Sequence, residues 1–137
     1  MPRKKSLSAR VRETAAPFLE DRERVLRAAE AMKGPRTIWA AMLGPIGYFI
    51  LLRPRHVALT NRRVIVAIPP ARGAGAPRLD LTLDRQETEV AEHAVGRLWV
   101  RLVLRDSTGR RVALNFARLW HEDAEFLRRR LSDPGRA

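Results

Sequence analysis

The chain has 137 residues, of which 45% are hydrophobic and 31% charged, so it is long enough for one compact domain with a packed core. It contains no cysteine, which excludes a disulfide scaffold, thiolate metal sites and cysteine nucleophiles and fits a cytoplasmic protein. The 27 basic residues outnumber the 15 acidic ones, and the net charge is +12 at pH 7. Polyanions are therefore the expected partners.

Two short stretches carry most of the excess charge. Residues 1–12 hold five basic residues and no acidic one, and residues 35–68 hold another five without an acidic one. Residues 1–8 predict a flexible basic arm, and residues 9–16 predict a short helix that Pro17 interrupts. Arginine outnumbers lysine 24 to 3, a bias typical of a high-GC genome, although guanidinium groups also suit phosphate.

The middle of the chain contains its least usual segment. Residues 23–32 are rich in helix formers, and Gly34 with Pro35 ends the element that they form. An uncharged run of fifteen residues follows at 38–52, shorter than the ~20 apolar residues that span a membrane. A Gly-Pro-x-Gly sequence within it disfavours a straight helix. The run is either buried at one end of the domain, as a hairpin or a helix, or exposed as an apolar insert.

The second half of the chain predicts strands followed by a helix. β-branched runs flank Asn61, which predicts a tight hairpin turn because asparagine tolerates left-handed dihedrals. Residues 97–104 and 112–116 alternate apolar and polar side chains around a second turn. The period then becomes helical, with one apolar face made by Trp120, Ala124, Leu127 and Leu131.

The chemistry-bearing residues form no recognisable catalytic or metal-binding pattern. The three histidines, His56, His93 and His121, are far apart in sequence and lack the spacing of metal ligands. There is no phosphate-binding glycine loop, nucleophile elbow or apolar-embedded carboxylate pair. We therefore expect neither an enzyme nor a protein with a metal or cofactor.

One aromatic residue has two interpretations. Trp99 lies between Arg97 and Arg101 on the polar face of a predicted strand. Its ring either packs under a loop or under the N-terminal helix, or is exposed for stacking on a base or for contact with a membrane interface.

Two motifs resemble those of a known domain family. The segment 57–66, Val-Ala-Leu-Thr-Asn-Arg-Arg-Val-Ile-Val, resembles a hairpin of bacterial pleckstrin-homology-like and GRAM-like domains, with Asn61 where aspartate is commoner. Residues 18–25 are similar to the acidic turn that precedes the first strand of such domains, with Arg22 in place of the usual glycine. The resemblance spans residues 18–131.

The resemblance implies a mainly β fold with helices, in which a seven-stranded, strongly bent antiparallel barrel or sandwich follows an N-terminal helix and is capped by a C-terminal helix. The strands are then expected at 23–32, 55–60, 63–68, 78–83, 87–93, 97–105 and 110–117. Residues 37–52 become an apolar insert between the first two strands. The implied organisation is a basic arm and short helix at 1–17, the domain at 18–132 and a tail at 133–137.

These features predict a non-enzymatic module that binds an anionic membrane or lipid, in the cytoplasm and peripherally at the inner face of the cell membrane. The predicted contacts to lipid phosphate are Arg36, Arg53, Arg55, Arg62 and Arg63. The predicted residues for apolar insertion, or for an interface, are Trp39, Ile46, Tyr48 and Phe49.

Two other functions remain open. In the first, the insert is buried in a homo-oligomer or against a protein partner, as in a scaffold domain. In the second, the basic charge binds nucleic acid without sequence specificity. If the insert is buried within the domain, aspartate in place of Ile46 or Phe49 should unfold it. If the insert is exposed, the domain should stay folded and lose binding.

Overall fold

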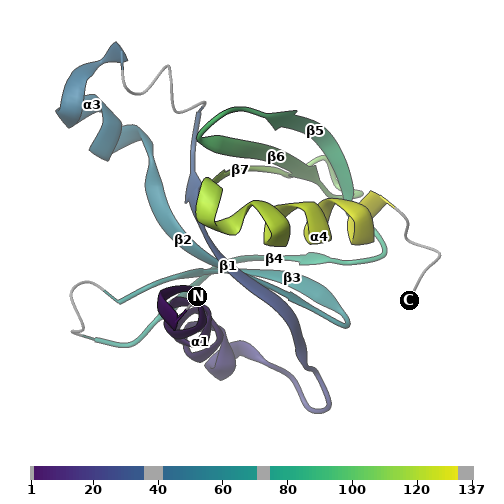
Figure 1. Cartoon of the computed structure of the whole chain (residues 1–137). Helices are drawn as coiled ribbons and strands as arrows, with labels where there is room; N and C mark the ends of the chain where they lie inside the picture. The colour runs from purple at the N-terminus through teal and green to yellow at the C-terminus, as the bar shows by residue number, and fades with distance from the viewer. Residues whose placement is uncertain (1, 36–41, 71–74, 133–137) are drawn as a thin grey trace.

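The computed structural model describes residues 2–35, 42–70 and 75–132. Seven antiparallel strands form one curled sheet in the order β4-β3-β2-β1-β7-β6-β5, and α4 lies across its concave side (Figure 1). The strands are β1 (Val25–Lys33), β2 (Arg53–Thr60), β3 (Arg63–Ile68), β4 (Arg78–Asp84), β5 (Glu89–Val95), β6 (Trp99–Arg105) and β7 (Arg111–Ala117). The helices are α1 (Pro2–Ala15), α3 (Gly44–Leu51) and α4 (His121–Ser132), with short 3-10 turns η1 (Ala16–Phe18) and η3 (Arg118–Trp120). This is the mainly β, bent antiparallel architecture that was expected.

The N-terminal helix is longer than the sequence predicts. Helix α1 begins at Pro2, so the expectation of a flexible arm at residues 1–8 is wrong. Proline suits the first turn of a helix because its missing N–H would have no partner there. Val11 and Ala15 are fully buried against the outer face of the sheet, and the Thr14 hydroxyl hydrogen-bonds His56 Nδ1 over 2.8 Å.

Residues 25–33 form a strand although their composition favours a helix. Strand β1 pairs with β2 along its length and, at Met32 and Lys33, with β7 on its other side. Ala28 and Ala29 are almost completely buried, one on each face of the strand. Tertiary pairing thus overrides local propensity. The expectation from the resemblance is confirmed within two residues at the start and one at the end.

The β2–β3 hairpin turns at the predicted place, but side-chain hydrogen bonds rather than a left-handed asparagine stabilise the turn. Asn61 does not adopt the expected left-handed conformation. Among the described residues, the one non-glycine residue with a positive φ is Arg22, at 64°. Instead, the Thr60 hydroxyl accepts hydrogen bonds from the N–H groups of Arg62 and Arg63. The Asn61 side chain accepts one from the Arg24 N–H at 2.9 Å, which joins the turn to the chain entering β1.

The remaining strands begin or end within two residues of the predicted positions. Strand β5 starts at Glu89, because residues 84–88 form a turn held by the Asp84 carboxylate and carbonyl. Strand β6 starts at Trp99, because Gly96 closes a tight turn by donating its N–H to the Trp99 carbonyl over 2.8 Å.

Helix α4 closes the core as predicted. The four predicted apolar positions, Trp120 at the end of η3 and Ala124, Leu127 and Leu131 on α4, are at most 2% exposed, which confirms the apolar face that the periodicity indicated. They pack on the inward side chains of the strands, including Leu102, Leu114 and Phe116. Acidic residues lie in the first turn of the helix and arginines in the last, which favours the helix dipole.

Candidate functional site

The described part of the apolar insert is an exposed helix. In Figure 1, α3 projects away from the curled sheet rather than covering its end. The Gly44-Pro45 pair, which we expected to break a helix, begins this one, since proline is accepted at the first helical positions. The exposed apolar stripe consists of four side chains that are 61–75% exposed: Met42 and Leu43, which directly precede α3, and Ile46 and Ile50, which lie one helical turn apart on it.

The base of the insert is fixed to the sheet by specific contacts. Gly34, which follows β1, donates its N–H to the Ala113 carbonyl on β7. The Gly34 carbonyl accepts hydrogen bonds from the side chains of Arg101 and Asn115, at 3.0 and 3.4 Å. Leu52, directly after α3, is 1% exposed. The helix is therefore exposed while both strands that carry it are anchored.

Basic side chains surround this base. Arg53 is exposed at the start of β2, and Lys33 lies opposite it in the β1–β2 register. Arg55 is buried and donates to the Asp80 carboxylate over 2.8 Å, while Lys33 donates to the same carboxylate over 2.9 Å. Burial raises the pKa of Asp80, but these hydrogen bonds and positive charges lower it further, so the pKa lies below its usual range. We call Lys33, Arg53 and Arg55 the basic rim, in which the Asp80 carboxylate is shared by Lys33 and Arg55.

Two of the predicted arginine contacts lie at the other end of the hairpin. Arg62 pairs with Glu20 over 3.2 Å, and Arg63 binds Glu23, whose side chain is fully buried. Strand β2 separates them from Arg53 by eight residues, which is ~25 Å at about 3.3 Å per residue. The five predicted arginines therefore do not form one cluster. Arg63 and Arg55 are engaged in structural ion pairs, which a sequence pattern could not reveal.

The structure describes only some of the remaining predicted residues. Arg36 and Trp39 lie outside the described residues, as does the side chain of Phe49. Tyr48 is half-buried on α3, and Ile46 is 75% exposed. Of the four predicted apolar contacts, Ile46 therefore lies openly on the exposed face.

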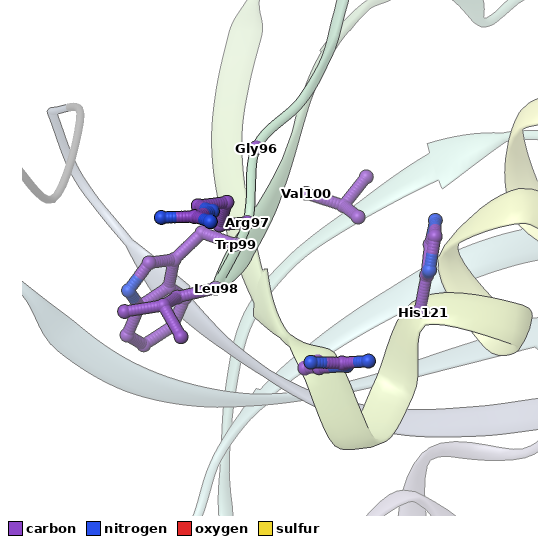
Figure 2. Close-up of a pocket in the computed structure, with 7 residues that line it drawn as sticks. Gly96, Arg97, Leu98, Trp99, Val100 and His121 are labelled. Carbon is purple, nitrogen blue, oxygen red and sulfur yellow. The ribbon is translucent and has the colours of Figure 1, made fainter.

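A groove at the β5–β6 turn contains residues that the sequence only partly identified. It has a volume of about 650 Å³ and lies between the β5–β6 turn and the start of α4. Figure 2 shows Arg97, Leu98 and Trp99 on one side and His121 on the other. Arg118, from η3, completes the lining. The fold brings Arg97 and Arg118 together from 21 positions apart in sequence, so no local pattern could have found the pair.

Trp99 connects this groove with the base of the insert. Its half-buried ring also lines a second hollow of about 290 Å³, shared with Met32, Pro54 and Arg55. The residue is half-buried between the two hollows, so it is not fully exposed, and its described neighbours in these hollows do not include α1.

The described ranges contain neither a membrane-spanning helix nor a cluster of metal ligands. No helix there is long and apolar enough to cross a bilayer. Within the same residues, no three histidine, aspartate or glutamate side chains are grouped closely enough to hold a metal ion.

Comparisons with known proteins identify the fold. No family model matches the chain, and no curated protein matches it by sequence. Among solved structures, it is similar to the Slm1-PH domain in complex with inositol-4-phosphate and to the same domain in complex with phosphoserine. In each case the TM-score is 0.50 and the identity 12%, over 80% of this chain and 94% of the other. Together with the seven-stranded topology, this likeness shows that the chain has a pleckstrin-homology-like fold.

Proposed function

We propose that the protein is a non-enzymatic binding module that associates reversibly with anionic membranes. The exposed apolar stripe on α3 enters the interface, and the basic rim meets the lipid headgroups. Arg53 has no acidic partner among the described residues and supplies the free charge of the rim, while Arg55 and Lys33 share Asp80. Arg36, directly before the insert, and Trp39 and Phe49 within it remain part of the proposal, whereas Arg62 and Arg63 at the far end of β2 do not.

The observation that carries the proposal is the exposed stripe directly beside the basic rim. Helix α3 has eight residues without a charge, and its exposed side chains would otherwise stay in contact with water. Transfer of one such side chain out of water contributes about 1.5–3 kcal/mol when burial is complete. Each basic residue near an anionic surface adds ~1 kcal/mol. The charge of the rim favours an anionic lipid surface over an uncharged protein patch as the occupant.

The solved relatives support the general class of ligand. The Slm1-PH domain was crystallised with inositol-4-phosphate and with phosphoserine, both of which carry phosphate. By extension, we propose a phosphate-bearing membrane surface as the partner of this chain, at the inner face of the cell membrane. We also propose the narrower kinship with bacterial and GRAM-like domains.

Co-sedimentation with vesicles tests this function. The wild-type protein is expected to bind anionic vesicles at physiological salt and to bind neutral vesicles much more weakly. The Ile46→Asp variant should stay folded, because Ile46 is 75% exposed, and its apparent affinity for anionic vesicles should fall by about tenfold or more. The loss has two causes, since the variant removes an inserted side chain and adds a charge that the membrane repels.

A charge-matched control lies at the far end of β2. The Asn61→Asp variant adds the same charge and keeps an oxygen acceptor for the Arg24 N–H, so it should bind as the wild type does. Equal binding by Ile46→Asp and Asn61→Asp would contradict insertion of α3. Binding that physiological salt removes from all three proteins would point to non-specific charge attraction. A wild-type dimer that Ile46→Asp dissociates, without vesicle binding by either, would favour a protein interface.

A further inference from the structure

The β5–β6 turn exposes apolar side chains at the tip of a hairpin. Leu98 is 67% exposed, and Val95, on the other side of the turn, is 56% exposed. The turn is tightly closed, because the Gly96 N–H donates to the Trp99 carbonyl over 2.8 Å. Leu98 is therefore held away from the core by a short, fixed turn. Apolar side chains that are already ordered in water can enter an apolar medium at a small further cost in entropy.

The tip lies at the same end of the domain as the base of α3. Trp99, which begins β6 directly after the turn, borders the hollow that Met32 and Pro54 line at the base of the insert. Two residues further along β6, the Arg101 side chain donates to the Gly34 carbonyl over 3.0 Å. The tip is ~10 Å from this contact along the strand, at about 3.3 Å per residue. The exposed apolar stripe and the tip are thus two separate apolar projections on one end of the molecule.

We propose that the tip of the β5–β6 hairpin is a second membrane anchor, in which Leu98 and Val95 enter the same bilayer as α3. A rigid protein surface would need a matching pocket to cover a projecting leucine, whereas a bilayer closes around it without one. The half-buried Trp99 lies next to Leu98 (Figure 2), and tryptophan is typical of the membrane–water interface.

The charges along the hairpin favour an anionic bilayer as the occupant. Arg97, within the turn, is exposed and makes no ion pair or side-chain hydrogen bond with another described residue. Further along the hairpin, Arg101 pairs with Glu92. At the opposite end, Arg105 pairs with Glu89. Of these three arginines, the one at the tip is the one whose charge is free to attract an anionic surface.

This inference rests on the proposed membrane association and goes beyond it, because two anchors determine an orientation. A single anchor at α3 would leave the domain free to tilt about that contact. With a second anchor at the tip, the end of the domain that carries the base of the insert faces the bilayer. The β2–β3 turn and the β6–β7 turn then point away from it.

The Leu98→Gln variant tests the second anchor. It keeps the net charge and should stay folded, because Leu98 is 67% exposed. Its apparent affinity for phosphatidylglycerol vesicles at physiological salt is expected to fall about fivefold, because an apolar side chain no longer leaves water. The Leu98→Met variant keeps an apolar side chain of similar size and should bind as the wild type does. Thermal unfolding of both variants checks that the fold is unchanged.

Labels at the two ends of β6 measure the orientation. The chain contains no cysteine, so the Leu98→Cys and Ser107→Cys variants each give a single labelling site. Ser107 is exposed in the turn between β6 and β7. On vesicle-bound protein, lipid-borne quenchers are expected to quench a fluorophore at position 98 and to leave one at position 107 unchanged.

The outcomes distinguish the tip from the association as a whole. Unchanged affinity of Leu98→Gln overturns the second anchor, and membrane association stands if Ile46→Asp still loses binding. Equal losses in Leu98→Gln and Leu98→Met overturn the apolar role of the tip. Equal quenching at positions 98 and 107 overturns the orientation. A wild-type dimer that Leu98→Gln dissociates makes the tip a protein interface and overturns the anchor. A wild type that binds no vesicles overturns both proposals.

Discussion

The Glu23→Gln variant is expected to be less stable than the wild type by about 3 kcal/mol at pH 7. The Glu23 side chain is fully buried and accepts a hydrogen bond from the Thr60 hydroxyl at 2.6 Å. It also accepts hydrogen bonds from Nε and Nη2 of Arg63 at 3.0 Å. The variant has nearly the same shape and leaves the partly buried Arg63 with only the exposed Glu20 carboxylate, 4.0 Å away, as a counter-charge. Removal of one partner is the costly way to break such a pair.

The stability difference should disappear in acid. Burial raises the pKa of Glu23, but hydrogen bonds from Arg63 and Thr60 outweigh it and lower the pKa from its ordinary 4.5 to about 2. Because the pKa is lower in the folded state, the carboxylate stabilises the fold fully above the unfolded-state value. This contribution is lost as the pH falls from about 5 to about 2. The wild type and Glu23→Gln should therefore have similar free energies of unfolding near pH 2.

Urea unfolding at several pH values measures both effects. The Glu20→Gln variant is the control, because the Glu20 side chain is 59% exposed and its pair with Arg62 is worth less than about 1 kcal/mol. A difference between Glu23→Gln and the wild type that stays constant from neutral pH to acid would contradict the assigned pKa. A loss at pH 7 as small as that of Glu20→Gln would contradict the assigned ion pair.

The Gly34→Ala variant is expected to destabilise the protein by a similar amount, about 3 kcal/mol, through strain and steric overlap. Gly34 has a φ of 147°, which side-chain-bearing residues rarely adopt. An added Cβ would lie 2.4 Å from the Leu51 carbonyl oxygen at the end of α3 and 3.2 Å from Leu52 Cδ2. Backbone movement would relieve the overlap but would break the hydrogen bonds that Ala113, Arg101 and Asn115 make with Gly34.

The Gly109→Ala variant separates strain from overlap. Gly109 has a φ of 88°, but no atom lies within 4 Å of an added Cβ, so its loss of stability should be limited to about 1 kcal/mol. Thermal unfolding of both variants gives the comparison. If Gly34→Ala is no less stable than Gly109→Ala, then the close contact between the two ends of the insert does not anchor it.

The resemblance of short motifs predicted this fold better than local propensity did. The alanines of β1 favour a helix in isolation. In the fold they allow close packing, because Ala28 and Ala29 are buried on opposite faces of a strand that α1 and α4 both contact. The alternation in residues 97–117 was sufficient by itself, since β6 and β7 follow it within two residues.

The candidate site could be predicted only in part. The uncharged run at 38–52 identified the insert, but its exposure depends on how Gly34 and Leu52 anchor its ends. The local excess of positive charge predicted Arg55 and Arg63 as ligand contacts. Their ion pairs could not be predicted, because the acidic partners lie 25 and 40 residues away in sequence. The groove could not be predicted, because Arg97, Arg118 and His121 are distant in sequence and line one groove only in the folded protein.

A fluorophore at position 46 tests most directly whether α3 enters the membrane. The chain contains no cysteine, so the Ile46→Cys and Gln86→Cys variants each give a single labelling site. Gln86 is exposed, and the backbone N–H of the preceding Arg85 donates to the Arg62 carbonyl. Position 86 therefore lies near the β2–β3 turn, at the other end of β2 from α3. On addition of anionic vesicles, an environment-sensitive label at position 46 should shift to shorter wavelength and be quenched by lipid-borne quenchers, while the label at position 86 should not change. An unchanged label at position 46 on vesicle-bound protein would contradict the account.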